Sequence, residues 1–155
     1  MIFTLILKIE SKFNYTGSNI TFNFLTPTRL VYQQDLVVRP DFHHIIRGAL
    51  RRLATLSLVH YGERLDVDFT DLINRSQSVG EVFDNTVWYD WERYSNRQKT
   101  RMKLGGFVGR VGFEGQLTDF IPFIKACEYF HIGKNTSFGL GLYETDTDIR
   151  TDFSL

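Results

Sequence analysis

The stretch DFHHIIRGALRRLATLSLVHYG, residues 41–62, sets the frame around which the rest of the chain can be ordered. Its apolar side chains recur every three or four residues, which is the period of one face of an α-helix. Asp41 follows a proline and can serve as the N-cap, and the pattern runs out at about Tyr61 and Gly62. The predicted apolar face consists of Phe42, Ile45, Ile46, Ala49, Leu50, Leu53 and Leu56.

The residues before this helix favour extended structure. Residues 20–25 alternate, with Ile20, Phe22 and Phe24 on one face, as in a half-buried strand. Pro27 interrupts the pattern, and residues 29–38 are expected to hold another extended piece. A turn-rich break at 14–19 separates these elements from residues 2–9, which also read as a strand.

The residues after the helix complete the fold prediction. Residues 66–76 suggest a short helix or loop, residues 81–93 and 104–116 two strands, residues 118–130 a helix, and residues 137–143 a last strand. From residue 20 onward the order is therefore strand, helix, strand, strand, helix, strand. This order predicts an α+β, ferredoxin-like (split βαβ) sandwich, in which two helices cover one face of a four-stranded antiparallel sheet.

The composition fits one globular domain of 155 residues, with 43% hydrophobic and 23% charged residues. The 18 basic and 18 acidic residues cancel, so any nucleic-acid site has to be a local patch. A single cysteine excludes a disulfide within the chain and fits a reducing compartment. No signal peptide and no apolar run of about 20 residues is found, so we expect a cytoplasmic protein without a membrane span.

The segment RYSNRQKTRMK, residues 93–103, is the first candidate binding site. It lies between two predicted strands, at or near a hairpin tip, and follows aromatic residues. Cationic side chains bind backbone phosphates, and aromatic rings stack on unpaired bases, so the pattern favours contact with RNA. The alternative is a solvated hairpin loop. Its cations are Arg93, Arg97, Lys99, Arg101 and Lys103.

The first predicted helix carries a second basic cluster. His43, Arg47 and Arg51 follow an i, i+4 spacing and share one helix face. This face can contact RNA, and the alternative is an ordinary solvated face.

The segment HIGKNTSFGLG, residues 131–141, is the third candidate. Gly133 stands where a helix ends, and Gly139 and Gly141 alternate along the predicted last strand. Consecutive amides of such a turn can hold an anion, with Lys134 adding charge. The alternative is a helix stop followed by a strand that a neighbour covers closely.

Other chemistries lack their motifs. The four histidines and one cysteine show no metal-ligand spacing, so we expect neither a metal nor a cofactor. Cys127 lies among apolar residues of a predicted helix and is interpreted as an inert buried thiol. No serine nucleophile elbow is found.

Three segments together resemble the C-terminal domain of the CRISPR-associated endoribonucleases that cut repeat RNA. They are RRLATLSLVHYG (51–62), WYDWERYSNRQKTRMKLGGFVGRVGFEG (88–115) and HIGKNTSFGLGLYE (131–144), and the resemblance runs from about residue 26 to residue 144. It implies repeat RNA as partner, a role in antiviral defence, and metal-independent cleavage by attack of a 2′-hydroxyl on the adjacent phosphate. It also implies that Gly133, Lys134, Gly139 and Gly141 position the RNA backbone.

The resemblance leaves catalysis open. Family members usually pair two ferredoxin-like domains, and in many the catalytic histidine lies in the N-terminal one. Residues 19–155 would be the RNA-binding domain here, and residues 1–18 a leading strand and turn left from a first domain. An N-terminal domain, other CRISPR-associated proteins or a second copy are the expected protein partners.

Acid and base candidates within this chain are His43, His44 and His131, because imidazole titrates near neutral pH. Lys134 could stabilise charge on the phosphorane. The competing hypothesis is a non-catalytic ferredoxin-like RNA- or protein-interaction module, since a fold does not determine a function.

Overall fold

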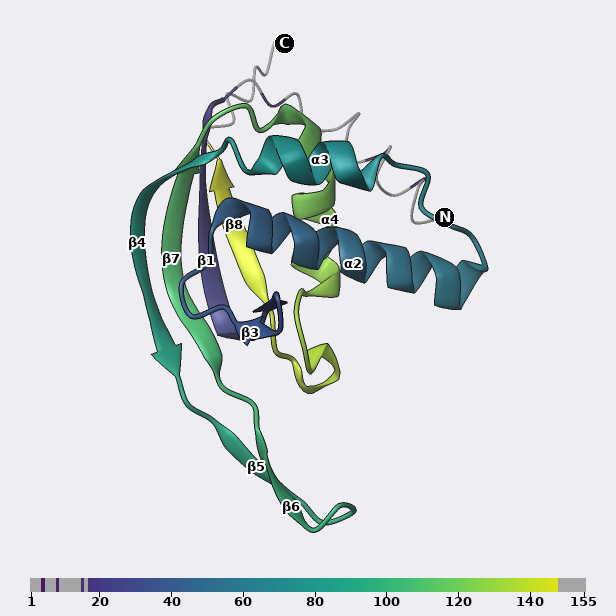
Figure 1. Cartoon of the computed structure of the whole chain (residues 1–155), viewed down its shortest axis with the longest axis vertical. Helices are drawn as coiled ribbons and strands as arrows, with labels where there is room; N and C mark the ends of the chain where they lie inside the picture. The colour runs from purple at the N-terminus through teal and green to yellow at the C-terminus, as the bar shows by residue number, and fades with distance from the viewer. Residues whose placement is uncertain (1–3, 5–7, 9–14, 16, 148–155) are drawn as a thin grey trace, which may run out of the picture.

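The fold is a four-stranded antiparallel sheet with the helices on one face (Figure 1). The computed structural model describes residues 4, 8, 15 and 17–147. The strands are β1 (Asn19–Thr28), β4 (Gly80–Tyr89), β7 (Gly106–Glu114) and β8 (Tyr143–Thr147), in the order β4-β7-β1-β8. With α2 (Phe42–Tyr61) after β1 and α4 (Ile121–Phe130) after β7, this order confirms the predicted ferredoxin-like fold.

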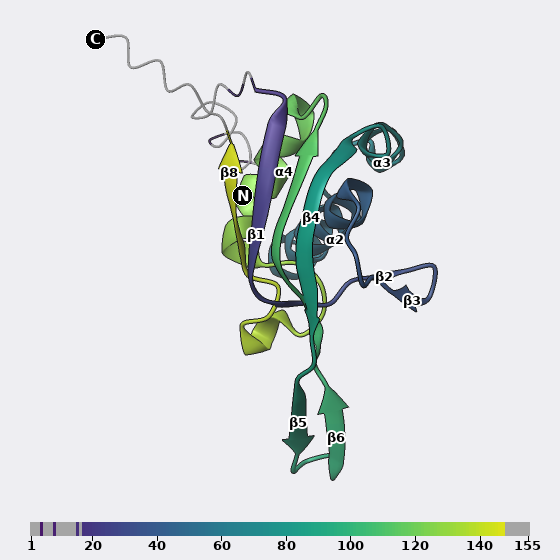
Figure 2. The ribbon, with the colours of Figure 1, turned by 90° about the vertical axis from the view of Figure 1, so that its left-hand side faces the viewer.

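Several short elements lie outside the four-stranded sheet and its two main helices. Two short hairpins, β2–β3 (Val31–Tyr32 and Asp35–Leu36) and β5–β6 (Glu92–Ser95 and Thr100–Lys103), stand outside the main sheet. Figure 2 shows the β5–β6 hairpin continuing from β4 and β7 as an arm beyond the sheet. The remaining elements are α3 (Phe69–Ser76) and the 3₁₀ turns η1 (Thr118–Phe120) and η2 (Thr136–Phe138).

The core forms between the sheet and α2, as the two periodic patterns predict. Ile20, Phe22 and Phe24 of β1 are buried, and so is the apolar face of α2 as far as Leu53. The ring of Phe22 contacts that of Phe42 edge-on, with 6.4 Å between centroids. Burial of these large rings supplies much of the hydrophobic stabilisation. At these positions the phenylalanines therefore form the core and do not belong to a binding surface.

Two predicted boundaries after residue 115 are wrong. The helix expected from residue 118 begins with η1, and α4 starts at Ile121. The strand expected at 137–143 is instead η2 followed by turns, and β8 begins only at Tyr143. Gly139 and Gly141 have φ angles of 80° and 76°, in the left-handed region that strands do not use.

The strand predicted at residues 2–9 lies almost wholly outside the described residues. The two that are described, Thr4 and Lys8, are helical, so the prediction is wrong at these positions. Within the part of the chain that the structure describes, no helix has both the length and the apolar composition of a membrane-crossing segment.

Candidate nucleic-acid interface

An open cavity of about 390 Å³ brings two of the three predicted clusters together. It lies between α2, the β2–β3 hairpin and the loop after α4. Among the described residues its lining contains no carboxylate. We call it the basic cavity, and its cationic side chains are Arg29, Arg47, Arg51, Arg52 and Lys134. Positive charge from three separate chain segments thus lines one hollow.

The loop from residue 131 to residue 142 reaches this cavity by crossing the end of β1. The amide of Lys134 donates to the Arg29 carbonyl (3.0 Å), and the amide of Gly141 donates to the Pro27 carbonyl (3.1 Å). The Thr26 hydroxyl adds a third tie, because it donates to the Gly139 carbonyl (2.9 Å). Main chain therefore packs directly on main chain at this crossing.

This crossing explains two of the glycines. A Cβ on Gly141 would lie 1.8 Å from the carbonyl oxygen of Ile132, and one on Gly133 would lie 2.5 Å from that of Arg29. A side chain at either position would displace backbone. Gly139 differs, since a Cβ there would meet nothing within 4 Å.

The loop does not present the expected row of bare amides. The amides of Ile132, Lys134, Gly139 and Gly141 all donate to protein carbonyls, so these four are not available to a phosphate. The helix ends at Phe130 as predicted, but its C-cap is His131 rather than Gly133. The side chain of Lys134 is what this segment contributes to the lining of the basic cavity.

The remaining predicted cluster, residues 93–103, lies on the β5–β6 hairpin, whose tip is formed by residues 96–99. Its base touches the loop, because the guanidinium of Arg93 stacks over the ring of Phe138, 4.8 Å from the centroid. Arg101 lies 3.7 Å from Glu92 in an exposed ion pair. The tip, with Arg97 and Lys99, points away from the sheet and is an extension rather than a wall of the basic cavity (Figure 1).

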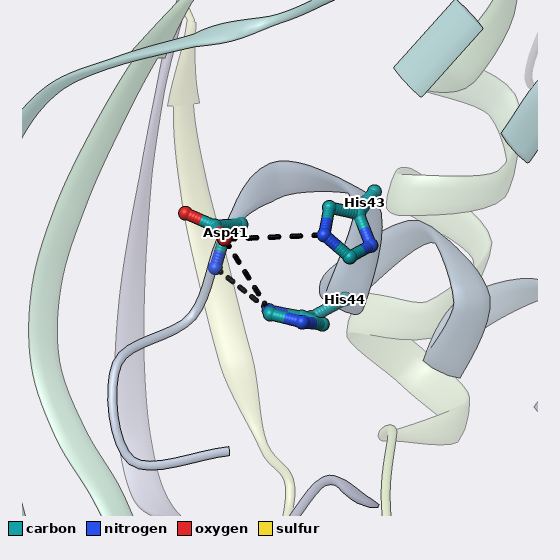
Figure 3. Close-up of side chains that lie close together, drawn as sticks. All are labelled: Asp41, His43 and His44. Atoms are coloured by element: carbon teal, nitrogen blue, oxygen red, sulfur yellow. Dashed lines mark hydrogen bonds and ion pairs between the residues drawn. The ribbon is translucent and has the colours of Figure 1, made fainter. Parts of the chain in front are cut away.

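His43 and His44 occupy the first turn of α2 beside Asp41 (Figure 3). The Asp41 amide donates to Nδ1 of His44 at 3.0 Å, which is the reciprocal contact of a capping box. The two imidazole centroids are 4.0 Å apart, and both rings contact Tyr32 edge-on. Of the two, only His44 lines the basic cavity.

Both histidines are neutral at neutral pH. Burial lowers the pKa of His44 to about 4, and the neighbouring His43 and Arg47 act in the same direction against Asp41. Burial likewise lowers the pKa of His43, with Arg47 assisting and Asp41 opposing. Neither ring is therefore a ready proton donor, and Nδ1 of each already accepts a hydrogen bond, from the Asp41 amide in His44 and from Nε of Arg47 in His43.

Asp41, His43 and His44 also form the one group of described residues whose ligand atoms are close enough to hold a metal ion, all within 4.8 Å. Three features oppose a cation there. Nδ1 of His44 already accepts the Asp41 amide, and the helix dipole is positive at this end. In addition, Nε of Arg47 donates to Nδ1 of His43 at 3.4 Å. The arrangement is better explained as a helix cap.

One predicted residue, His131, lies outside the basic cavity, and one residue that was not predicted, Arg29, lines it. His131 has its Nδ1 3.1 Å from the Leu140 carbonyl and is not part of the basic-cavity lining. Arg29, just after β1, was not predicted as a site residue because no local pattern marks it. Its role depends on the crossing of β1 by a loop about a hundred residues later, which only the tertiary structure shows.

The match to known families decides the classification. The family model of the CRISPR-associated endoribonuclease Cas6 matches residues 22–143. The chain belongs to this family. The resemblance found in the sequence is thereby confirmed, and a search of curated proteins finds no match.

Solved Cas6 structures share the fold. A Thermus thermophilus Cas6 matches with a TM-score of 0.67 and 17% identity, over 91% of this chain and 57% of that chain. A Cas6 product complex matches with a TM-score of 0.62 and 16% identity, over 95% and 56%. A partial Cas6-RT-Cas1–Cas2 complex matches with a TM-score of 0.67 and 10% identity, over 97% and 27%. The chain thus spans little more than half the length of the first two Cas6 structures.

Proposed function

We propose that this Cas6-family domain binds CRISPR repeat RNA, and the basic cavity is the observation that carries the proposal. Arginine and lysine side chains from the end of β1, from α2 and from the loop after α4 line it without a carboxylate among the described residues. Guanidinium groups bind phosphate through paired hydrogen bonds, and several cations in one hollow suit a bent ribose-phosphate backbone.

The β5–β6 hairpin supplies a second contact in this proposal. It extends beyond the sheet and carries exposed cations, with Tyr94 57% exposed for contact with a base or sugar. Because Arg93 stacks on Phe138, the arm and the loop are held in a defined relation. The proposed RNA-contacting residues are Arg47, Arg51, Arg93, Arg97, Lys99, Arg101, Lys103 and Lys134. Gly133, Gly139 and Gly141 are proposed to shape the loop that carries Lys134 rather than to contact RNA through their amides.

Cleavage would proceed by attack of a ribose 2′-hydroxyl on the adjacent phosphate, leaving a cyclic phosphate and a 5′-hydroxyl. His43, His44 and His131 remain the candidate bases. His44 lines the basic cavity, but its Nδ1 accepts the Asp41 amide and its pKa is lowered to about 4, so it would act as a base only after this hydrogen bond breaks. Arg47 and Lys134 would stabilise the phosphorane charge. The leaving oxygen needs a proton donor, and neither neutral imidazole of α2 supplies one. We therefore assign binding and positioning of RNA to residues 19–155, and cleavage would need a proton donor other than these two histidines.

The proposed setting is the cytoplasm, together with other CRISPR-associated proteins. One matching structure is a Cas6-RT-Cas1–Cas2 complex. A second copy or an N-terminal domain are the other candidate partners.

Titration of a labelled repeat RNA in EDTA, followed by fluorescence anisotropy at several salt concentrations, tests the proposal. The separate variants Arg47→Ala, Arg51→Ala and Lys134→Ala should each weaken binding and reduce the salt slope by about one unit. Arg64→Ala, beyond the far end of α2, is the matched control and should change neither quantity. Product analysis of the same samples shows whether the chain cleaves without metal.

Two results would contradict the proposal that the domain binds RNA through its phosphates. Absence of binding at low salt would refute the proposal. Salt-independent binding that the three variants leave unchanged would favour the alternative, an interaction module that does not recognise RNA through its phosphates.

A further inference from the structure

A second open cavity, of about 530 Å³, lies where the β5–β6 hairpin leaves the main sheet. Both tryptophans of the chain, Trp88 and Trp91, line it, and Leu36 and Val38 of the β2–β3 region face them. Trp91, Leu36 and Val38 are 37%, 40% and 54% exposed, so the apolar walls are open to a ligand. The volume is within the range of ligand pockets, and of the three predicted clusters only Lys103 belongs to the lining of this cavity.

The wall on the hairpin side is held by backbone contacts. The amide of Leu104 donates to the Trp91 carbonyl at 2.7 Å, joining the two chains of the arm at its base. Gly105 allows a close approach there, since a Cβ on it would lie 2.8 Å from the Tyr89 carbonyl oxygen. Nη1 of Arg29 donates to the Gly105 carbonyl at 2.9 Å. The pocket is thus formed before any ligand enters, which lowers the entropic cost of binding.

Two carboxylates line this aromatic pocket. Asp90 and Glu92 belong to its lining. The indole N–H of Trp88 donates to Oδ1 of Asp90 at 2.9 Å, which fixes the orientation of that carboxylate. An ionised carboxylate only accepts hydrogen bonds, so it selects a ligand edge that carries N–H donors.

We propose that this pocket takes one unpaired guanine base of the bound RNA. Unstacked bases of single-stranded RNA are recognised by stacking on aromatic side chains and by hydrogen bonds to their Watson–Crick edge. Guanine presents two adjacent donors on that edge, N1–H and the N2 amino group, which match the two oxygens of one carboxylate. Adenine and cytosine offer one amino group beside an acceptor, and uracil one N–H between two acceptors, so each fits a carboxylate less well.

The pocket lies next to the proposed phosphate site and shares one lining residue with it. Arg29 lines both cavities, and Lys103 adds a second cation beside the tryptophans. An RNA strand whose phosphates lie in the basic cavity can therefore direct a neighbouring base into the pocket. The inference rests on the proposed RNA-binding function and adds a base preference to it.

Intrinsic fluorescence reports on this pocket alone, because both tryptophans line it. The probes are the 5′-monophosphates of guanosine, adenosine, cytidine and uridine, with excitation at the red edge of indole absorption. GMP should quench the emission saturably, with a half-saturation concentration at least fivefold lower than that of UMP. Asp90→Asn should bring the four nucleotides within about twofold of one another.

Variants of the stacking surface complete the test. Trp91→Leu should remove saturable quenching of Trp88 by GMP, whereas Trp91→Phe, which keeps a ring, should retain it. Tyr129→Leu is the matched control, since it truncates an aromatic residue of α4 that is 78% exposed and lies outside the pocket lining. Far-ultraviolet circular dichroism identifies any variant that fails to fold.

The outcomes separate the inference from the proposed function. Equal response to all four nucleotides, or a GMP response that survives Trp91→Leu in a folded variant, overturns the guanine pocket. If labelled repeat RNA still binds through Arg47 and Lys134 in that case, the proposed function stands without the pocket. If neither the nucleotides nor repeat RNA bind, both fail.

Discussion

Gly141 is the position where one added methyl group should have the largest effect on stability. Its φ angle is 76°, and a Cβ would lie 1.8 Å from the Ile132 carbonyl oxygen. Gly139 has a similar φ angle of 80°, but a Cβ there meets nothing within 4 Å. Alanine at either position incurs the left-handed backbone penalty of about 1 kcal/mol. Only at Gly141 must the backbone also move.

The movement should break two hydrogen bonds, from the Ile132 amide to the Gly141 carbonyl and from the Gly141 amide to the Pro27 carbonyl. At about 1 kcal/mol each, they raise the expected loss for Gly141→Ala to about 3 kcal/mol or more. Gly139→Ala should lose about 1 kcal/mol.

Urea unfolding followed by tryptophan fluorescence measures both losses. In thermal unfolding they correspond to a fall in Tm of about 6–12 °C for Gly141→Ala and about 2–4 °C for Gly139→Ala. Equal losses for the two variants would refute the steric reasoning, because the backbone angles are alike and only the surroundings differ.

Three further predictions concern polar side chains that are buried or partly buried. Because the pKa of His44 is lowered from 6.5 to about 4, the unfolded chain binds more protons between these values, so stability is present above pH 6.5 and declines as the pH falls towards 4. His44→Gln keeps an acceptor for the Asp41 amide, so urea unfolding at pH 7.5 and 5 should show unchanged stability at the higher pH and a weaker pH dependence; an unchanged pH dependence would contradict this. Burial raises the pKa of the Cys127 thiol, so Ellman's reagent should label it only on unfolding, and rapid labelling of the native protein would be inconsistent with the fold. Arg52→Ala removes the hydrogen bond from Nε to the Phe130 carbonyl (3.0 Å) and should lower the free energy of unfolding by about 1–2 kcal/mol. An unchanged free energy of unfolding would contradict this, because it would show that water satisfies the Phe130 carbonyl equally well.

The sequence predicted the elements whose signal is continuous along the chain. The apolar stripe of α2 repeats over about four turns, and the alternation of β1 is carried by large side chains, so both were identified correctly. The last strand was misplaced because Gly139 and Gly141 imitate a period of two. Their positive φ angles follow from the packing of the loop on β1, which a local pattern does not contain.

The candidate site was predicted in pieces but not as an arrangement. The helix cations and Lys134 were identified from local charge, yet their meeting at one cavity depends on a backbone crossing between residues far apart in the chain. The same crossing places Arg29 between both cavities. Periodicity says which face of an element is polar, and only packing decides which polar faces meet.

The geometry also changes the explanation of the glycine-rich loop. If glycine served mainly to present amides to RNA, those amides would have to be free, but four of them donate to protein carbonyls. The glycines at 133 and 141 instead allow two pieces of main chain to touch, and this contact fixes the backbone of Lys134 beside that of Arg29. A fixed backbone limits where the Lys134 side chain can reach, which lowers the entropy that is lost when a cation binds. Under the proposed function, substitutions at 133 or 141 should therefore weaken RNA binding by lowering the stability of the crossing, whereas loss of the Lys134 side chain should weaken it directly.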